Sequence, residues 1–237
     1  EAINGYAKAA AVTNTFRVTK ALATVELGNL AQTYDGMPRV VTATPTPAGL
    51  TVEITYDGST NAPTAAGSYA VTGTVVDVFH QGTATGTLVV AKAGSTITAT
   101  GTTLFTYDGT EQGPDTASVT GSTGAVTYEY GGTGATVYGP SATKPTGAGT
   151  YEVVATVAAD DNYEGADSAA LAFEIAKAAS TIAATGTTAY TYNGTAQGPD
   201  TASVTGSTGA VTYEYSGTDA TVYGPSATKP TGAGTYE

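Results

Sequence analysis

Apolar and polar residues alternate one by one along many short stretches of this chain. Two examples are residues 125–130 and 50–56, in which Val, Ile, Leu and Tyr are separated by small or polar residues. A period of two places the apolar side chains on one face of a β-strand, so the pattern predicts half-buried sheets. No stretch shows the 3.6-residue apolar period of a helix, and the chain is therefore predicted to be all-β.

Turn signals separate the alternating stretches. Asp-Gly or Asn-Gly pairs occur at residues 35–36, 57–58, 108–109 and 193–194, and such pairs favour tight turns. Short strands with turns every 8–12 residues or so are typical of an Ig-like β-sandwich. Because the chain has no Cys and no Trp, the core is predicted to consist of Tyr, Val, Leu, Ile and Phe.

The chain also repeats itself. Residues 95–152 match residues 180–237 at a constant offset of 85, with seven differences over 58 positions. Three copies of one strand end, FRVTKA at 16–21, LVVAKA at 88–93 and FEIAKA at 173–178, mark the domain boundaries. The predicted parts are the C-terminal strands of a preceding domain at 1–21, a whole domain at 22–93, a second at 94–178, and the front of a near-identical third at 179–237.

The linkers between these domains are very short. A single residue, Gly94 or Ala179, separates each AKA strand end from the next domain. Linkers of this length leave no room for a flexible tether. The sequence therefore predicts tandem Ig-like domains that touch end to end in an elongated rod.

Part of the chain resembles a known family. LGNLAQTYDGMPRVV from Leu27, APTAAGSYAVTGTVVD from Ala62 and GTATGTLVVAKA ending at Ala93 are similar to the MBG ("mostly bacterial Ig") domain. The similarity covers residues 22–93, and the 85-residue units resemble a related bacterial Ig-like repeat. It implies tandem β-sandwich modules of very large secreted or surface-attached bacterial proteins, often adhesins, with no catalytic residues to transfer. One departure is His80, which stands where the other unit has Tyr163.

Charge narrows the classes of partner. Only 12% of the residues are charged and the net charge is -12, so phosphate backbones and anionic lipid surfaces would be repelled. No apolar run reaches the roughly 18–20 residues that span a bilayer. The expected partners are the neighbouring repeats of the same chain and copies of the chain in a fibre, without nucleic acid or membrane insertion.

We predict no catalytic, cofactor-binding or metal-binding residue. His80 has no nucleophile and orienting acid beside it in the sequence pattern, so a strand-edge or loop position is expected. The best acidic cluster is Asp160, Asp161 and Asn162, whose oxygens at a domain end offer a Ca²⁺ site. The competing interpretation is a solvated loop, because the domain at 22–93 keeps only Asp77 at the matching positions.

Other motifs are interpreted as turns. The Gly-rich runs at 121–124 and 132–134 precede no helix, so they lack the amide cradle of a phosphate loop. Asn193 fits the rule for a glycan acceptor, but the parallel unit has Asp108 there. Turns are expected at the two Gly-rich runs and at Asn193.

Three lysines at strand ends invite two interpretations. Lys20, Lys92 and Lys177 share strand parity with the apolar residues before them. In one interpretation the stem packs against the domain and the ammonium reaches water at the junction. In the other, the lysine forms an isopeptide crosslink to Asn or Asp, as in some bacterial surface domains.

The sequence GAGTYE occurs at 147–152 and again at 232–237. Either the third domain continues in a longer chain, or the 1–21 segment of another copy completes it by strand addition. Joining the two ends would omit the equivalent of Val153–Val157, a whole apolar strand, which favours the longer chain.

These observations predict a structural role rather than an enzymatic one. We expect a stalk or fibre segment of a giant extracellular or cell-surface bacterial protein, which spaces an adhesive region from the cell or builds a filament. The alternative is a module that binds glycans or a partner through tyrosines, for example Tyr128, Tyr130, Tyr213 and Tyr215. Strand parity places these four in phase with Val126 or Val211, which predicts that they are buried.

Overall fold

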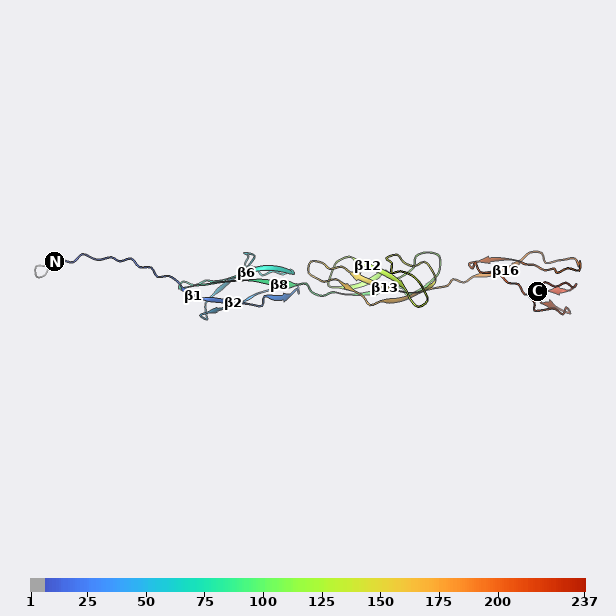
Figure 1. Ribbon diagram of the computed structural model, residues 1–237, viewed down its shortest axis with the longest axis horizontal. Coiled ribbons are helices and arrows are strands. Elements are labelled where there is room, and N and C mark those ends of the chain that lie inside the picture. Colours follow the sequence, from blue (N-terminus) through green and yellow to red (C-terminus); the bar gives the residue numbers. More distant parts are fainter. Residues whose placement is uncertain (1–6) are drawn as a thin grey trace. The chain divides into compact units, whose positions relative to one another are not determined.

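The computed structural model describes residues 7–237, and every regular element in that range is a β-strand (Figure 1). This confirms the all-β prediction from the alternating pattern. No segment of the described range forms a helix of the length and apolarity needed to cross a membrane. The described chain divides into two compact units, and the division passes through the repeat at 94–178. The first unit holds the residues up to Gly101, 115–129 and 153–171, and the second holds 102–114, 130–152 and 172–237.

Residues 22–93 form two antiparallel layers with one parallel edge. A two-stranded sheet pairs β2 (Thr24–Gly28) with β4 (Thr42–Thr46). A four-stranded sheet has the order β3 (Ala31–Thr33), β8 (Thr83–Ala91), β6 (Gly67–Val75) and β5 (Val52–Tyr56). Only β3 and β8 run parallel in that sheet. A short parallel pair joins β1 (Ala21–Leu22) to β7 (His80–Gln81).

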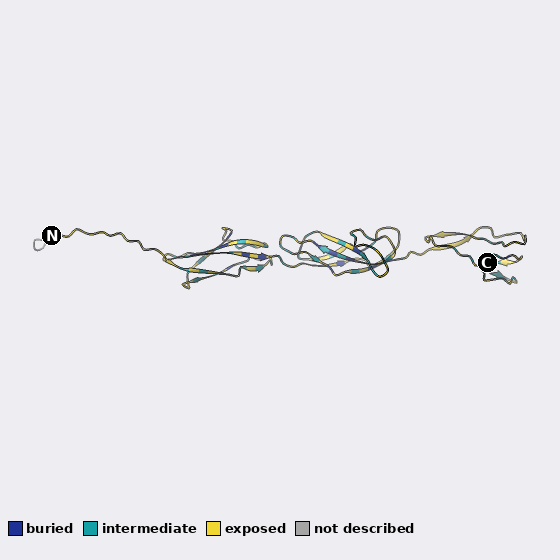
Figure 2. Ribbon diagram, viewed as in Figure 1, coloured by how far each residue is buried: buried dark blue, intermediate teal, exposed yellow. Residues whose placement is uncertain are grey.

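The core of this repeat lies between the two sheets. It is made of Val41, Tyr56, Val71, Leu88 and Val90, with Leu27 and Leu30 packed against them. Along β6 and β8, buried and exposed residues alternate, as a two-residue period requires. Figure 2 shows buried and exposed stretches on the strands of this repeat. The core composition predicted from the sequence is therefore confirmed for this repeat.

Residues 94–178 repeat the same strand order. β9 (Thr96–Thr100) pairs with β11 (Thr116–Thr120). The larger sheet has the order β10 (Leu104–Thr106), β15 (Leu171–Ala176), β13 (Gly149–Val157) and β12 (Val126–Gly132), and β14 (Ala166–Asp167) adds to β13. The parallel pair again involves the first and last strands of the repeat's larger sheet, β10 and β15. Two sandwiches of one topology therefore follow each other in the sequence.

The third stretch holds fewer strand pairs. β16 (Thr181–Thr185) pairs with β17 (Thr201–Thr205), and β18 (Gly217–Thr218) pairs with β19 (Thr235–Tyr236). The first pair has the register of β9 with β11, as the offset of 85 predicts.

The two GAGTYE segments share a tyrosine hydrogen bond. The hydroxyl of Tyr151 donates to the carbonyl of Gly147 at 2.7 Å, and Tyr236 does the same to Gly232 at 2.9 Å. In the first repeat Tyr69 donates to Ala65 at 3.0 Å. A tyrosine that bonds to the backbone a few residues upstream is the tyrosine corner of Ig-like sandwiches.

The described segment before the first repeat lies outside the sheets up to residue 20. Residues 16–21 were expected to form a strand of a preceding domain, but the described residues 7–20 contain no strand. Phe16 and Val18 are 87% and 83% exposed, because no other described segment pairs with them. A single strand cannot satisfy its backbone groups or bury its apolar face alone. The part of this prediction that concerns residues 1–6 lies outside the described residues.

Candidate functional site

The loop that follows β13 in the second repeat is organised around one carboxylate. Oδ1 of Asp160 accepts hydrogen bonds from the backbone N–H of Asn162 and Tyr163 at 2.9 and 2.8 Å. Oδ2 accepts from the backbone N–H and the hydroxyl of Thr123 at 2.8 and 3.1 Å. Four donors stabilise the charged form, and the backbone N–H of Thr123 is the largest contributor. Together they lower the pKa of Asp160 to about 2.

The same loop binds the chain segment that leaves β8. Lys92 Nζ donates to the backbone carbonyl of Asp160 at 2.6 Å. Ala93 N–H donates to the carbonyl of Asn162 at 2.9 Å, and Glu164 N–H donates to the carbonyl of Ala93 at 2.8 Å. Ala93 thereby makes a parallel bridge with Tyr163. The end of one repeat is thus an additional short strand for the next.

Two side chains of the loop reach residues far from this linker. Oδ1 of Asn162 accepts the backbone N–H of Ala66 at 2.9 Å. The ring of Tyr163 meets the ring of Tyr34 edge to face, with centroids 5.3 Å apart and planes at 79°. All these residues, from Tyr34 to Glu164, belong to the first compact unit. We call residues 160–164 the junction loop.

A second copy of this arrangement lies in the loop between β6 and β7 of the first repeat, where the chain that enters that repeat meets it. Oδ1 of Asp77 accepts the backbone N–H of Phe79 and His80 at 2.8 and 2.7 Å. Lys20 Nζ donates to the carbonyl of Asp77 at 2.5 Å, and Ala21 N–H donates to the carbonyl of Phe79 at 2.8 Å. A Lys-Ala strand end that adds to an Asp-x-x-aromatic loop is therefore used twice.

His80 has a local partner in this second copy. Its Nδ1 lies 2.7 Å from Oδ1 of Asp77, and this hydrogen bond is the main reason that the pKa of Asp77 is lowered. His80 lies at the start of the two-residue strand β7, as expected for a strand-edge position.

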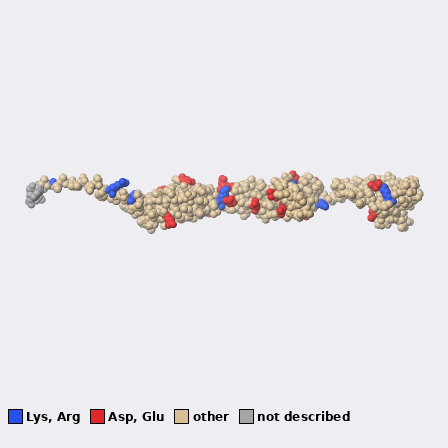
Figure 3. Space-filling model, in the orientation of Figure 1, with Lys and Arg blue, Asp and Glu red and all other residues tan. Residues whose placement is uncertain are grey.

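The hydrogen bonds leave little for a cation at Asp160 and Asn162. Both carboxylate oxygens of Asp160 and the Oδ1 of Asn162 already accept N–H or O–H donors, whereas a Ca²⁺ ligand oxygen must present a lone pair to the ion. Within residues 7–237 no group of three His, Cys, Asp or Glu residues is arranged for a metal ion. Figure 3 shows acidic side chains scattered over the visible face rather than gathered in one patch.

The three lysines fall into two classes. Lys20 and Lys92 donate their ammonium groups to the backbone carbonyls of Asp77 and Asp160. Lys20 and Lys177 are exposed, and Lys92 is half-buried. The hydrogen bond accounts for Lys20 and Lys92 without a covalent bond. The isopeptide crosslink remains a prediction that an intact-mass measurement decides.

The remaining motifs serve turns. Asn193 Oδ1 accepts the N–H of Thr195 at 3.0 Å, as Asp108 does from Thr110 at 2.8 Å. Gly121 has a φ of 102°, and Ser122 after it donates its hydroxyl to the carbonyl of Ala158 at 2.6 Å. The hydrogen bonds at these positions stabilise turns and loops of the chain.

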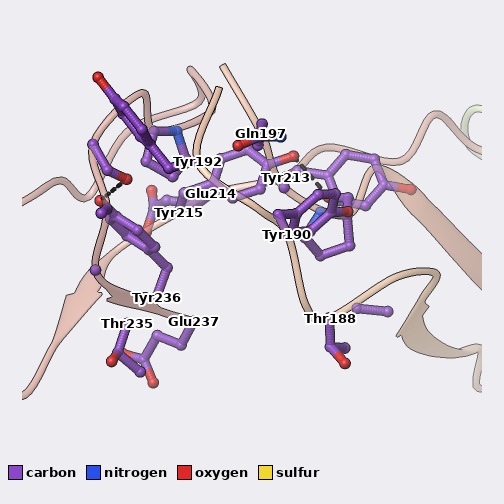
Figure 4. A pocket seen from close by; sticks show the side chains of 17 residues that line it. Thr188, Tyr190, Tyr192, Gln197, Tyr213, Glu214, Tyr215, Thr235, Tyr236 and Glu237 are labelled. Atoms are coloured by element: carbon purple, nitrogen blue, oxygen red, sulfur yellow. Dashed lines mark hydrogen bonds between the residues drawn. The ribbon is translucent and has the colours of Figure 1, made fainter. Parts of the chain in front are cut away.

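The third repeat contains an open groove of about 620 Å³ within the second unit (Figure 4). Its aromatic wall consists of Tyr190, Tyr192, Tyr213, Tyr215 and Tyr236. In the second repeat, Phe173 stacks on Tyr151 at 5.3 Å and meets Tyr130 edge to face at 6.2 Å. At the offset of 85 those two tyrosines correspond to Tyr236 and Tyr215. In the second repeat, the two matching tyrosines are therefore covered by Phe173 of β15.

Of the four candidate tyrosines, the predicted burial is confirmed for Tyr130 and Tyr215. Tyr130 and Tyr215 are 2% and 6% exposed, and each donates its hydroxyl to a proline carbonyl at 2.8 Å. Tyr128 and Tyr213 are half-buried.

Sequence reasoning missed Asn162 and Tyr163 as contacts between repeats. The run Asp160 to Asn162 was interpreted as a set of oxygen ligands for Ca²⁺, and nothing local in the sequence points to Ala66 or Tyr34. One signal could have found them. His80 follows Asp77 at the same spacing as Tyr163 follows Asp160, and a Lys-Ala strand end lies at the start of each repeat, at residues 20–21 and 92–93.

Comparison with known proteins gives one assignment. The family model described as "MBG domain" matches residues 23–94 and again residues 95–180. No curated protein matches the chain.

Proposed function

The chain belongs to the MBG-domain family, and we propose that it is a structural spacer, a stalk or fibre segment of a giant bacterial cell-surface or extracellular protein. In this role it holds an adhesive region away from the cell or contributes length to a filament. The proposal assigns no catalytic chemistry, cofactor or nucleic acid to the chain. It rests on the tandem family copies together with the junction loop.

The junction supports a spacer because it leaves no free linker. Ala93 is hydrogen-bonded to the next repeat on both its N–H and its carbonyl. A segment paired in this way does not behave as the flexible coil that lets domains tumble. Near-identical repeats at 95–152 and 180–237 also fit a protein in which copy number sets length.

Small-angle X-ray scattering of the full chain tests the spacer role. We expect the pair-distance distribution of an elongated particle, with a long tail beyond its maximum. A symmetric distribution, as given by a compact globule, would contradict the proposal.

Binding of glycans or a protein partner is the alternative function. Its support is the tyrosine-lined groove of the third repeat, while burial of Tyr130 and Tyr215 argues against their use as a binding platform. A glycan array probed with the full chain separates the two functions. The spacer proposal expects no retention, and saturable binding to one glycan class would replace it.

Self-assembly by strand addition is a second candidate with an observation in its favour. Phe16 and Val18 are exposed, and FRVTKA matches FEIAKA of β15, whose Phe173 occupies the place that is open in the third repeat. Sedimentation velocity at rising concentration tests it with a Phe16→Asp variant. Association that the variant abolishes supports strand addition, and a concentration-independent monomer removes it.

A further inference from the structure

The contacts of the junction loop fall into two classes with different mechanical consequences. The bonds to Lys92 and Ala93 involve the linker itself, and alone they would allow the repeats to swivel about it. The contacts of Asn162 with Ala66 and of Tyr163 with Tyr34 involve loops at other places in the first repeat. Rotation about the linker would break both of these.

We propose that the junction loop is a docking site by which a repeat fixes the orientation of the repeat before it. The surface that docks consists of the Ala66 amide, the Tyr34 ring and the Lys92-Ala93 strand end. The inference concerns one pair of neighbours, residues 22–93 and 94–178, and it stands whether the array serves as a spacer or a binding module.

The hydrogen bonds of Asp160 preorganise the junction loop for contact with the repeat before it. Asp160 uses both carboxylate oxygens to hold the backbone at Thr123, Asn162 and Tyr163. The backbone at Asn162 is therefore held before contact, and a preorganised loop loses less conformational entropy on contact. The hydrogen bonds that lower the pKa of Asp160 keep this carboxylate charged into the acid range.

The contacts of Asn162 with Ala66 and of Tyr163 with Tyr34 depend on the relative orientation of the two repeats. Ala66, whose N–H is the donor, is half-buried, and a donor in such a place is costly to leave without its acceptor. The two rings meet at 79°, the edge-to-face arrangement that the quadrupoles of aromatic rings favour. A tilt of one repeat would spoil both contacts at once.

The second copy of the arrangement indicates that the docking loop is a feature of the repeat and is not confined to one junction. Asp77 organises its loop with the same two backbone bonds, and Lys20 and Ala21 occupy the places of Lys92 and Ala93. The residue in the place of Asn162 there is Phe79, so the side-chain contact is specific to each junction.

Because the chain has no cysteine, two introduced cysteines allow the orientation to be measured by spin labelling. Thr60→Cys and Ala169→Cys replace one exposed residue in each of the two repeats. Double electron–electron resonance on the full chain is expected to give one narrow distance distribution. The double variant Asn162→Ala/Tyr163→Leu should lose that narrow distribution, while Asp161→Ala, an exposed neighbour in the same loop, should keep it.

A melting curve by circular dichroism checks that each variant remains folded. If the double variant melts early, Asn162→Ala alone serves in its place and should broaden the distribution to a smaller extent. A broad distribution in the unmodified junction, or an unchanged narrow one after loss of Asn162, would overturn the proposal.

Discussion

Single residues in this chain work mainly through hydrogen bonds to the backbone. Asp35, Asp108 and Asn193 each accept the N–H two residues later at 2.8 to 3.0 Å, and the glycines after them have φ values of 82°, 82° and 75°. Only the pair Asp57-Gly58 joins two bonded neighbours, Tyr56 and Ser59, as a two-residue hairpin turn does. The Asp-Gly and Asn-Gly pairs therefore predicted turns correctly. In three of the four turns, the side chain of the Asp or Asn accepts the hydrogen bond that closes the turn.

Asp160 gives a pH dependence with a defined sign. Its folded pKa of about 2 lies below the ordinary value of 3.8, so its stabilising effect is fully present above pH 3.8 and disappears as the pH falls toward 2. We expect Asp160→Asn to be less stable than the parent at neutral pH, with the difference shrinking through that acid window. Urea unfolding of both proteins at several pH values measures it; a constant difference would show that the charge is unimportant.

The tyrosine corner offers a test at a second residue. Tyr151 is 3% exposed and donates to Gly147 at 2.7 Å. Tyr151→Phe removes this donor and should lower the free energy of unfolding by about 1 kcal/mol. Tyr69→Phe removes the corresponding but exposed bond in the first repeat and should have a smaller effect. Equal effects in denaturant melts would contradict the role given to burial.

Pairs of strands are positioned by what lies between the sheets. A Cβ added at Gly73 of β6 would lie 3.1 Å from Leu27 Cδ2 and 3.3 Å from Val52 Cγ1. β2 can therefore approach β6 closely only because the side chain is absent. The two-residue apolar period explains which face of each strand is buried, and this glycine explains how close the two layers come.

Gly73→Ala is expected to destabilise the first repeat by about 1–3 kcal/mol, because an extra methyl overpacks the core. Gly94→Ala is the matched control, since a Cβ there meets nothing within 4 Å and Ala179 stands at the same place in the next linker. Thermal melts of the two variants make the comparison. A stable Gly73→Ala variant would mean that the sheets can move apart at little cost.

The sequence was informative wherever structure depends on neighbours in the chain. Alternation identified strands such as β5 and β12, and the offset of 85 accounts for the pairing of β16 with β17 in the register of β9 with β11. It was uninformative about contacts between distant segments. Asn162 and Ala66 are 96 residues apart, and an Asp-Asp-Asn run reads equally as a cation site or as a loop that binds its own amides. Whether residues 16–21 pair as a strand depends on a partner segment, which the local pattern cannot supply.

The molecule as a whole is a tandem of MBG domains whose junction is built by both neighbours. Its net charge of -12 is spread over a surface with few other charged residues. Such a surface limits unspecific association of the repeats through self-repulsion. Under the proposed spacer function, each added repeat contributes reach and requires no new chemistry.

The central claim is tested most directly by adding length. A chain that carries one or two further copies of residues 95–179, inserted after Ala179, is compared with the parent by small-angle X-ray scattering. Strands of nine residues at about 3.3 Å each predict that the maximum dimension grows by roughly 30 Å or somewhat more with every copy. Growth in equal steps is the expected result, whereas a maximum dimension that stays nearly constant while the mass rises would show that the repeats fold back on one another and do not act as a spacer.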